Sequence, residues 1–167
     1  TYCNYGFIAS FARTMVLEEK STENAQAFCS YVRTSLSQIS PGASGECYRG
    51  VGQSLPFIDD DSLGKPPEMI AFAIRSCESM TSIENELQTC VGGAFNYLDV
   101  KQVRGEYGLS INQDDPTAIC KEQKEEYRSV CYGNSKRTVL TTVKNGSESD
   151  FGTAIQQIVR QYNSLDK

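Results

Sequence analysis

The sequence predicts an all-α protein built from disulfide-stapled helical hairpins, stacked as a short degenerate repeat array. Apolar residues recur at the three- and four-residue spacing of amphipathic helices, and the seven cysteines recur with a period of about 43 residues. The composition, with 39% hydrophobic and 22% charged residues in a chain of 167, is typical of a folded domain and not of a disordered segment.

The first two helices are expected at 7–19 and 22–39. The first has apolar residues at helical spacing on one amphipathic stripe: Phe7, Ile8, Phe11, Met15 and Val16. Ser21 or Thr22 offers an N-cap for the second, whose apolar residues also fall on one stripe. The segment 40–45, which contains proline and two glycines, is expected to end this helix.

Two further helices are expected at 67–91 and 116–132. Pro66 or Pro67 suits the first helical position, and a long apolar stripe follows it. Asp115 repeats this start signal as a cap before a proline, and strong helix formers then continue without a glycine as far as residue 132.

The C-terminal part is expected to hold a last helix at 150–163. The segment 136–144 before it is rich in β-branched residues, which favour a strand. A lone strand would have no partner in this chain, so we expect helix or irregular structure there.

The gaps between successive cysteines alternate between long and short, at 26, 18, 30, 13, 30 and 11 residues. The first set consists of cysteines that follow one another at spacings of 44, 43 and 41 residues: Cys3, Cys47, Cys90 and Cys131. The second set consists of cysteines at spacings of 48 and 43 residues: Cys29, Cys77 and Cys120. Each cysteine of the first set is followed within three residues by a glycine, at Gly6, Gly50, Gly92 and Gly93, and Gly133. The pattern predicts one domain, 1–167, with approximate repeats at 1–46, 47–89, 90–130 and 131–167.

Two pairings of the cysteines are possible. Pairing across the short gaps joins Cys29–Cys47, Cys77–Cys90 and Cys120–Cys131, and leaves Cys3 odd. Pairing across the long gaps joins Cys3–Cys29, Cys47–Cys77 and Cys90–Cys120, and leaves Cys131 odd. A single helix from 120 to 131 would hold its ends about 16 Å apart, whereas a disulfide needs Cα atoms within about 7 Å. We therefore favour the long-gap pairing, in which every loop contains a turn.

Cysteine usage also indicates the compartment. No Cys-x-x-Cys pair and no histidine is present, which favours disulfides over a zinc site. We therefore expect a secreted, extracellular protein, and the sequon at Asn145 predicts a glycosylated loop. The chain begins with Thr and not Met, as expected of a processed chain or a fragment.

Several functional classes are disfavoured. The absence of histidine excludes Ser-His-Asp, Cys-His and His-Glu-x-x-His sites, so we predict no enzyme, no cofactor and no metal. Adjacent acidic residues at 59–61 could contribute to a calcium loop, but a plain acidic loop is favoured because the full EF-hand pattern is missing. A net charge of −5 disfavours nucleic acid, and no apolar run is long enough for membrane insertion.

Two functions remain. The first is an extracellular structural or interaction module that binds protein, either by self-association or by contact with another extracellular chain, and that can build a larger assembly or filament. The nine tyrosines suit such half-buried surfaces. The second is a secreted helical carrier that holds a small apolar ligand between its helices. A central cavity would favour the carrier, and its absence would favour the module.

Overall fold

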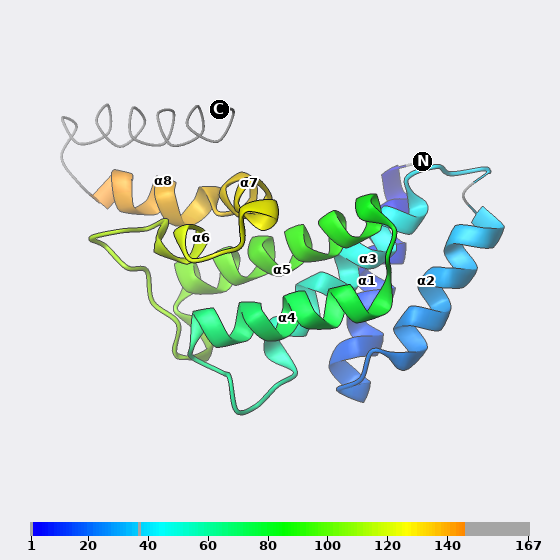
Figure 1. Cartoon of the computed structure of the whole chain (residues 1–167), viewed down its shortest axis with the longest axis horizontal. Helices are drawn as coiled ribbons and strands as arrows, with labels where there is room; N and C mark the ends of the chain where they lie inside the picture. Colours follow the sequence, from blue (N-terminus) through cyan, green and yellow to red (C-terminus); the bar gives the residue numbers. More distant parts are fainter. Residues whose placement is uncertain (1, 37, 146–167) are drawn as a thin grey trace.

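The computed structural model describes residues 2–36 and 38–145, and every regular element in these ranges is helical (Figure 1). The all-α prediction is therefore confirmed. The elements are α1 (Tyr2–Glu19), α2 (Glu23–Leu36), α3 (Ala43–Ser54), η1 (Leu55–Phe57), α4 (Pro66–Met80), α5 (Glu84–Arg104), η2 (Glu106–Gly108), α6 (Ala118–Lys121), α7 (Glu125–Asn134) and α8 (Lys136–Asn145). None of these described helices has the length and apolar character needed to cross a membrane.

Helix α5 is the longest of the described helices and forms the centre of the molecule. Helix α3 packs against α5, and α1 packs against α3, so that α1, α3 and α5 follow one another in a row (Figure 1). Helix α2 lies against α1 and α3 at the N-terminal end. Helix α4 runs along α5, and α7 and α8 pack against α5 at the other end of the molecule.

Glycines set the spacing within this row. A Cβ atom added to Gly50 of α3 would lie 2.0 Å from the Ala9 carbonyl oxygen of α1. One added to Gly52 would lie 1.8 Å from the Cys90 carbonyl oxygen of α5. Because no side chain separates these backbones, α1, α3 and α5 approach more closely than side-chain packing normally permits. Gly50 and Gly52 therefore serve close helix contact.

The three disulfides join Cys29–Cys47, Cys77–Cys90 and Cys120–Cys131, with Cα separations of 5.5, 5.9 and 5.4 Å. The favoured long-gap pairs, Cys3–Cys29, Cys47–Cys77 and Cys90–Cys120, are therefore wrong, and Cys131 is not the odd cysteine. Each bridge joins two consecutive helices: α2 to α3, α4 to α5, and α6 to α7.

The pairing prediction failed because two expected helices are each broken into a hairpin. The expected helix at 116–132 ends at Lys121 and resumes at Glu125. Two backbone carbonyls at the break accept hydrogen bonds from nearby side chains. The Gln123 side chain donates to the Ile119 carbonyl, and the Arg128 side chain donates to the Gln123 carbonyl. Helix propensities differ by tenths of a kcal/mol per residue, whereas a disulfide of this loop length contributes about 3 kcal/mol. The bridge therefore outweighs the propensity of this segment.

The expected helix at 67–91 is broken in the same way, between Met80 and Glu84. Thr81 is extended at this point, and its hydroxyl accepts a hydrogen bond from the Ile83 amide at 3.2 Å. The letters TSIE match the Ser/Thr-x-x-Glu pattern of a helix start, so the sequence did carry a signal for this break.

The remaining expectations have mixed outcomes. Helix α4 begins at Pro66, one of the two prolines expected at its first position, and the segment 136–144 is helical in α8. Helix α3 was not predicted, and it begins inside the segment expected to act only as a terminator. The expected helix at 150–163 lies outside the described residues, as does the side chain of the sequon residue Asn145. The 43-residue period and the repeat boundaries stay predictions.

Candidate functional site

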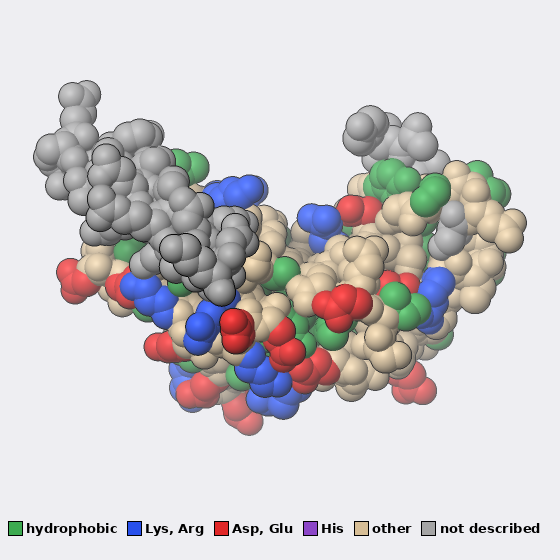
Figure 2. All heavy atoms as spheres, turned by 45° about the horizontal axis from the view of Figure 1, so that its top comes forward, with side chains coloured by type: hydrophobic (Ala, Val, Ile, Leu, Met, Phe, Trp, Pro, Cys, Tyr) green, Lys and Arg blue, Asp and Glu red, His purple; other side chains and the backbone are tan. Residues whose placement is uncertain are grey.

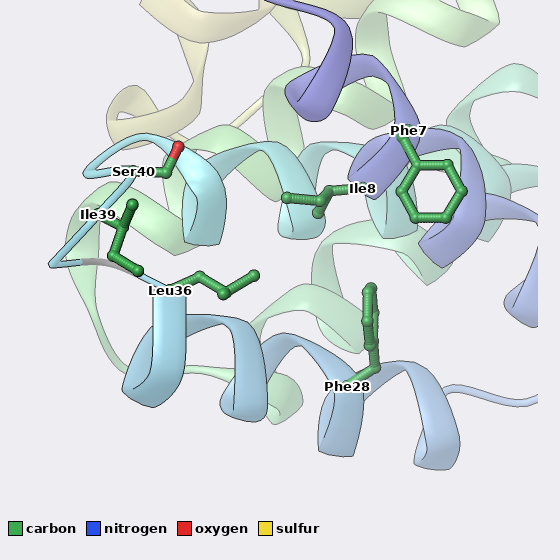
Figure 3. A pocket seen from close by; sticks show the side chains of 6 residues that line it. All are labelled: Phe7, Ile8, Phe28, Leu36, Ile39 and Ser40. Atoms are coloured by element: carbon green, nitrogen blue, oxygen red, sulfur yellow. The ribbon is translucent and has the colours of Figure 1, made fainter. Parts of the chain in front are cut away.

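The candidate site is an apolar groove between α1 and α2. It encloses about 290 Å³, and its lining comes from the two helices and the connection that follows α2: Phe7, Ile8, Phe28, Leu36, Ile39 and Ser40. Figure 3 shows Phe28 rising from α2 toward α1, with Phe7 and Ile8 on the opposite wall. We call this feature the α1–α2 groove.

The groove exists because α1 is apolar on two sides. Its inner side, with Ile8, Ala12 and Val16, is buried in the core. Its outer side carries Phe7 and Phe11, whose ring centres lie 5.9 Å apart. Phe11 also makes an edge contact with Phe28 of α2, at 5.0 Å between ring centres, which holds the two walls together.

Large apolar side chains at the groove are open to solvent. Phe7 is 67% exposed and Ile39 is 83% exposed, and Tyr31, one turn beyond Phe28 on α2, is 60% exposed. Figure 2 shows hydrophobic side chains gathered at the end of the molecule that carries the N-terminus. Soluble proteins seldom leave several large apolar side chains together in water unless that surface binds something.

The chemistry of the lining limits what the groove can do. Ser40 supplies the one hydroxyl among the six lining side chains, and none of the six is ionisable. Binding there must therefore rest on burial of apolar surface, because no lining side chain offers a charge or a nucleophile suited to catalysis.

A cluster of side chains that hydrogen-bond to one buried carboxylate lies next to α3. Glu86 of α5 accepts hydrogen bonds from Arg33 at 3.1 Å, from Thr81 at 2.7 Å and from Ser44. These donors come from α2, the α4–α5 connection and α3. Since Glu86 is almost fully buried and accepts three hydrogen bonds, its role is to hold these elements together and not to bind an external group.

Tyr48 of α3 is the titratable neighbour of this cluster. Its side chain is fully buried, and its hydroxyl makes no hydrogen bond with any described residue. Burial, followed by the negative charge of Glu86, raises the pKa of Tyr48 above its ordinary value. The phenol therefore stays protonated and acts as a packing residue.

A second cluster fixes the turn after α5. The Lys101 ammonium lies 5.0 Å from the ring centre of Tyr97 and 5.6 Å from that of Tyr107, and it pairs with Glu106. Burial acts to lower the pKa of Lys101, but the hydrogen bond and charge of Glu106 and the two tyrosines raise it overall. The hydrogen bond from Lys101 lowers the pKa of Glu106 in return.

The acidic segment 59–61 has its own local partners. Asp60 pairs with Lys20 at 2.6 Å, and the carbonyls of Asp59 and Asp61 accept hydrogen bonds from Ser62 and Lys65. Within the described ranges, no group of three or more Cys, Asp or Glu side chains is arranged to hold a metal ion.

None of the six residues that line the groove is a predicted site residue. The cysteines from Cys29 to Cys131 are buried staples. The expected amphipathic stripe of the first helix is divided, since Ile8 is buried while Phe7 and Phe11 are exposed. The signal that could have indicated the groove is the presence of apolar residues on more than one face of α1.

Comparison of the chain with protein-family models, with curated proteins and with solved structures found no match. The function must therefore be inferred from the geometry of the molecule.

Proposed function

We propose that this chain is a non-enzymatic, extracellular interaction module that binds another protein through the α1–α2 groove. The observation that carries the proposal is the exposure of Phe7 and Ile39 beside an apolar hollow of about 290 Å³. Aromatic and large apolar side chains around a concave surface are typical anchors of protein interfaces.

The architecture that we propose is the short degenerate array of stapled hairpins, with a period of about 43 residues. In support, the three bridges join consecutive helices in one fixed order, α2–α3, α4–α5 and α6–α7. The location that we propose is extracellular, because three disulfides in one small domain are typical of oxidising compartments.

The alternative function, a carrier of a small apolar ligand, is favoured by one observation. The lining of the groove is apolar except for one hydroxyl, which suits an acyl chain as well as a protein side chain. Against it, the helices of the central row meet backbone to backbone at Gly50 and Gly52, which leaves no room for a ligand between them. The groove is at the edge of the fold, where a protein partner has access.

Photo-crosslinking distinguishes the two functions. The variant Ile39→benzoylphenylalanine places a photoreactive group at the groove, and Leu140→benzoylphenylalanine places it on α8 as a matched exposed control. Irradiation of the medium of producing cells should give a discrete protein adduct from position 39 and none from position 140. A co-purifying fatty acid in native mass spectrometry, with no protein adduct at position 39, would favour the carrier instead.

A further inference from the structure

We propose that the uncovered face of α1 binds the same face of a second copy of this chain. The result is a two-fold symmetric dimer in which Cys3 of one copy forms a disulfide with Cys3 of the other. This inference rests on the proposed function and names the partner of that surface.

The first line of evidence is a shared register in three helices. A glycine follows a cysteine by three residues in α1, α3 and α5, as Cys3–Gly6, Cys47–Gly50 and Cys90–Gly93. In α3, Gly50 meets the backbone of α1 at Ala9. In α5, a Cβ atom on Gly93 would lie 2.4 Å from the Arg49 carbonyl oxygen of α3. In both helices this glycine faces the helix that precedes it in the row.

The second line of evidence is that the equivalent position in α1 is open. A Cβ atom on Gly6 would meet no described atom within 4 Å, and Gly6 is exposed. Helix α1 is the first helix of the row, so its glycine face has no neighbour among the described helices. The same kind of contact that joins α3 to α1 can therefore continue onto a further helix.

The surface around Gly6 fits this contact. Phe7 and Ser10 are exposed on the same helix, and Phe7 connects this face to the α1–α2 groove. Residues 1–12 contain no charged side chain, although the whole chain has a net charge of −5. Two copies can therefore meet here without the like-charge repulsion that the acidic remainder of the surface would cause.

The cysteine count selects a second copy as the occupant. Six of the seven cysteines in the 167 residues form the three bridges, so a cysteine that pairs with Cys3 has to come from outside these residues. A two-fold axis close to Cys3 would supply an identical partner, and it would bring Gly6 of each copy near the other α1, because Gly6 follows by only about 4.5 Å along the helix. Most homo-oligomers are two-fold dimers of this isologous kind.

The covalent step is thiol–disulfide exchange with a small disulfide such as oxidised glutathione. Two Cys3 thiols lose their protons and are oxidised to one interchain disulfide, while one molecule of oxidised glutathione is reduced to two of glutathione. Oxidants of this chemical class also form intrachain bridges, so the dimer needs no additional reagent.

The test is the mass of the full chain, purified without reductant and equilibrated with a glutathione redox buffer. Intact mass spectrometry should show a species of twice the 18.5 kDa chain, and a proteolytic digest should yield a Cys3–Cys3 linked peptide. In the variant Cys3→Ser, sedimentation velocity should still show a reversible dimer whose fraction rises with protein concentration.

The variant Gly6→Leu tests the surface. Because the space beside Gly6 is open, the monomer should fold normally, but the added side chain should lower the dimer association constant at least tenfold. The variant Ser129→Leu, at an exposed position on α7, is the matched control and should leave association unchanged.

Two results would overturn the inference. One is a monomer at every concentration, with Cys3 carrying glutathione or a free thiol. The other is a dimer that the Gly6→Leu change does not weaken. If either occurs while Ile39→benzoylphenylalanine still gives an adduct with a different protein, the proposed interaction function stands and only the identity of its partner is wrong.

Discussion

The two ends of the molecule use different contacts against the same central helix. Toward the N-terminus, α3 meets α5 through backbone atoms, at Gly52 and Gly93. Toward the C-terminus, α7 meets α5 through side chains, since a Cβ atom on Gly92 would lie 3.2 Å from the Asn134 amide nitrogen and 3.6 Å from a Val130 methyl. A backbone contact cannot adapt to an added atom, whereas a side-chain contact can shift. The N-terminal row should therefore be the rigid part of the fold.

The largest expected effect comes from the variants Gly52→Ala and Gly92→Ala. The methyl at position 52 would lie 1.8 Å from a backbone oxygen, so α3 and α5 would have to separate, and we expect a loss of at least about 3 kcal/mol or failure to fold. At position 92 the Asn134 side chain can move, and the gain in helix propensity of about 1 kcal/mol offsets the crowding. Urea unfolding measures both, and similar losses would contradict the proposed difference between the two ends.

The next effect comes from removing single disulfides. The double variant Cys120→Ala/Cys131→Ala should lose about 3 kcal/mol in the chain-entropy model, because the bridge closes a loop in the unfolded chain. Hydrogen exchange should increase in α6 and α7 and stay unchanged in α3. The double variant Cys29→Ala/Cys47→Ala should instead raise exchange across α2 and α3. If both variants raised exchange throughout the molecule, the two ends would form a single cooperative unit.

A smaller effect is expected at the start of α8. The buried Asp99 of α5 accepts hydrogen bonds from the Arg137 and Thr138 amides, at 3.0 and 2.8 Å, and so caps α8 from another helix. The variant Asp99→Ala should lose about 2 kcal/mol and expose these two amides to hydrogen exchange. Asp114→Ala, at an exposed loop position, is the control. Unchanged exchange at 137 and 138 would contradict the capping role.

The smallest effect is a pH dependence near α6. Burial acts to raise the pKa of Asp115, but hydrogen bonds from Lys121 and Thr117 hold it below its usual value. A lowered folded pKa means that the stabilisation is present above the unfolded pKa, near 4, and is lost as the pH falls through the folded pKa. The difference in unfolding free energy between the wild type and Asp115→Asn should be less than about 1 kcal/mol at pH 6 and should shrink as the pH falls below about 4. A difference that grows on acidification would contradict this sign.

The sequence predicted the helical class because apolar spacing reports buried faces directly. It did not predict helix α3, since Gly50 and Gly52 count against a helix on propensity alone. Their favourable effect appears only when α1 and α5 are in place on either side, and that information is not local. The same limit applies to the disulfides, because a break at 122–124 in a run of helix formers is decided by the bridge across it.

The groove was missed for a related reason. Spacing placed Phe7, Ile8 and Phe11 on one apolar side of a helix, but it could not determine which part of that side would meet α3 and which part would stay in solvent. The long apolar side chains of α1 exceed what its neighbours can cover. Such an excess becomes visible only after the packing partners are known.

The placement of the bridges has a mechanical consequence. Each bridge closes a short loop between consecutive helices, with separations of 18, 13 and 11 residues, and the chain between the bridges is unrestrained. A force pulling on the two ends would therefore meet no covalent lock between one hairpin and the next. The glycine contacts of the row and the side-chain contacts of α7 with α5 would bear the load, and the chain would lengthen in steps as each hairpin detached, while its closed loop stayed intact.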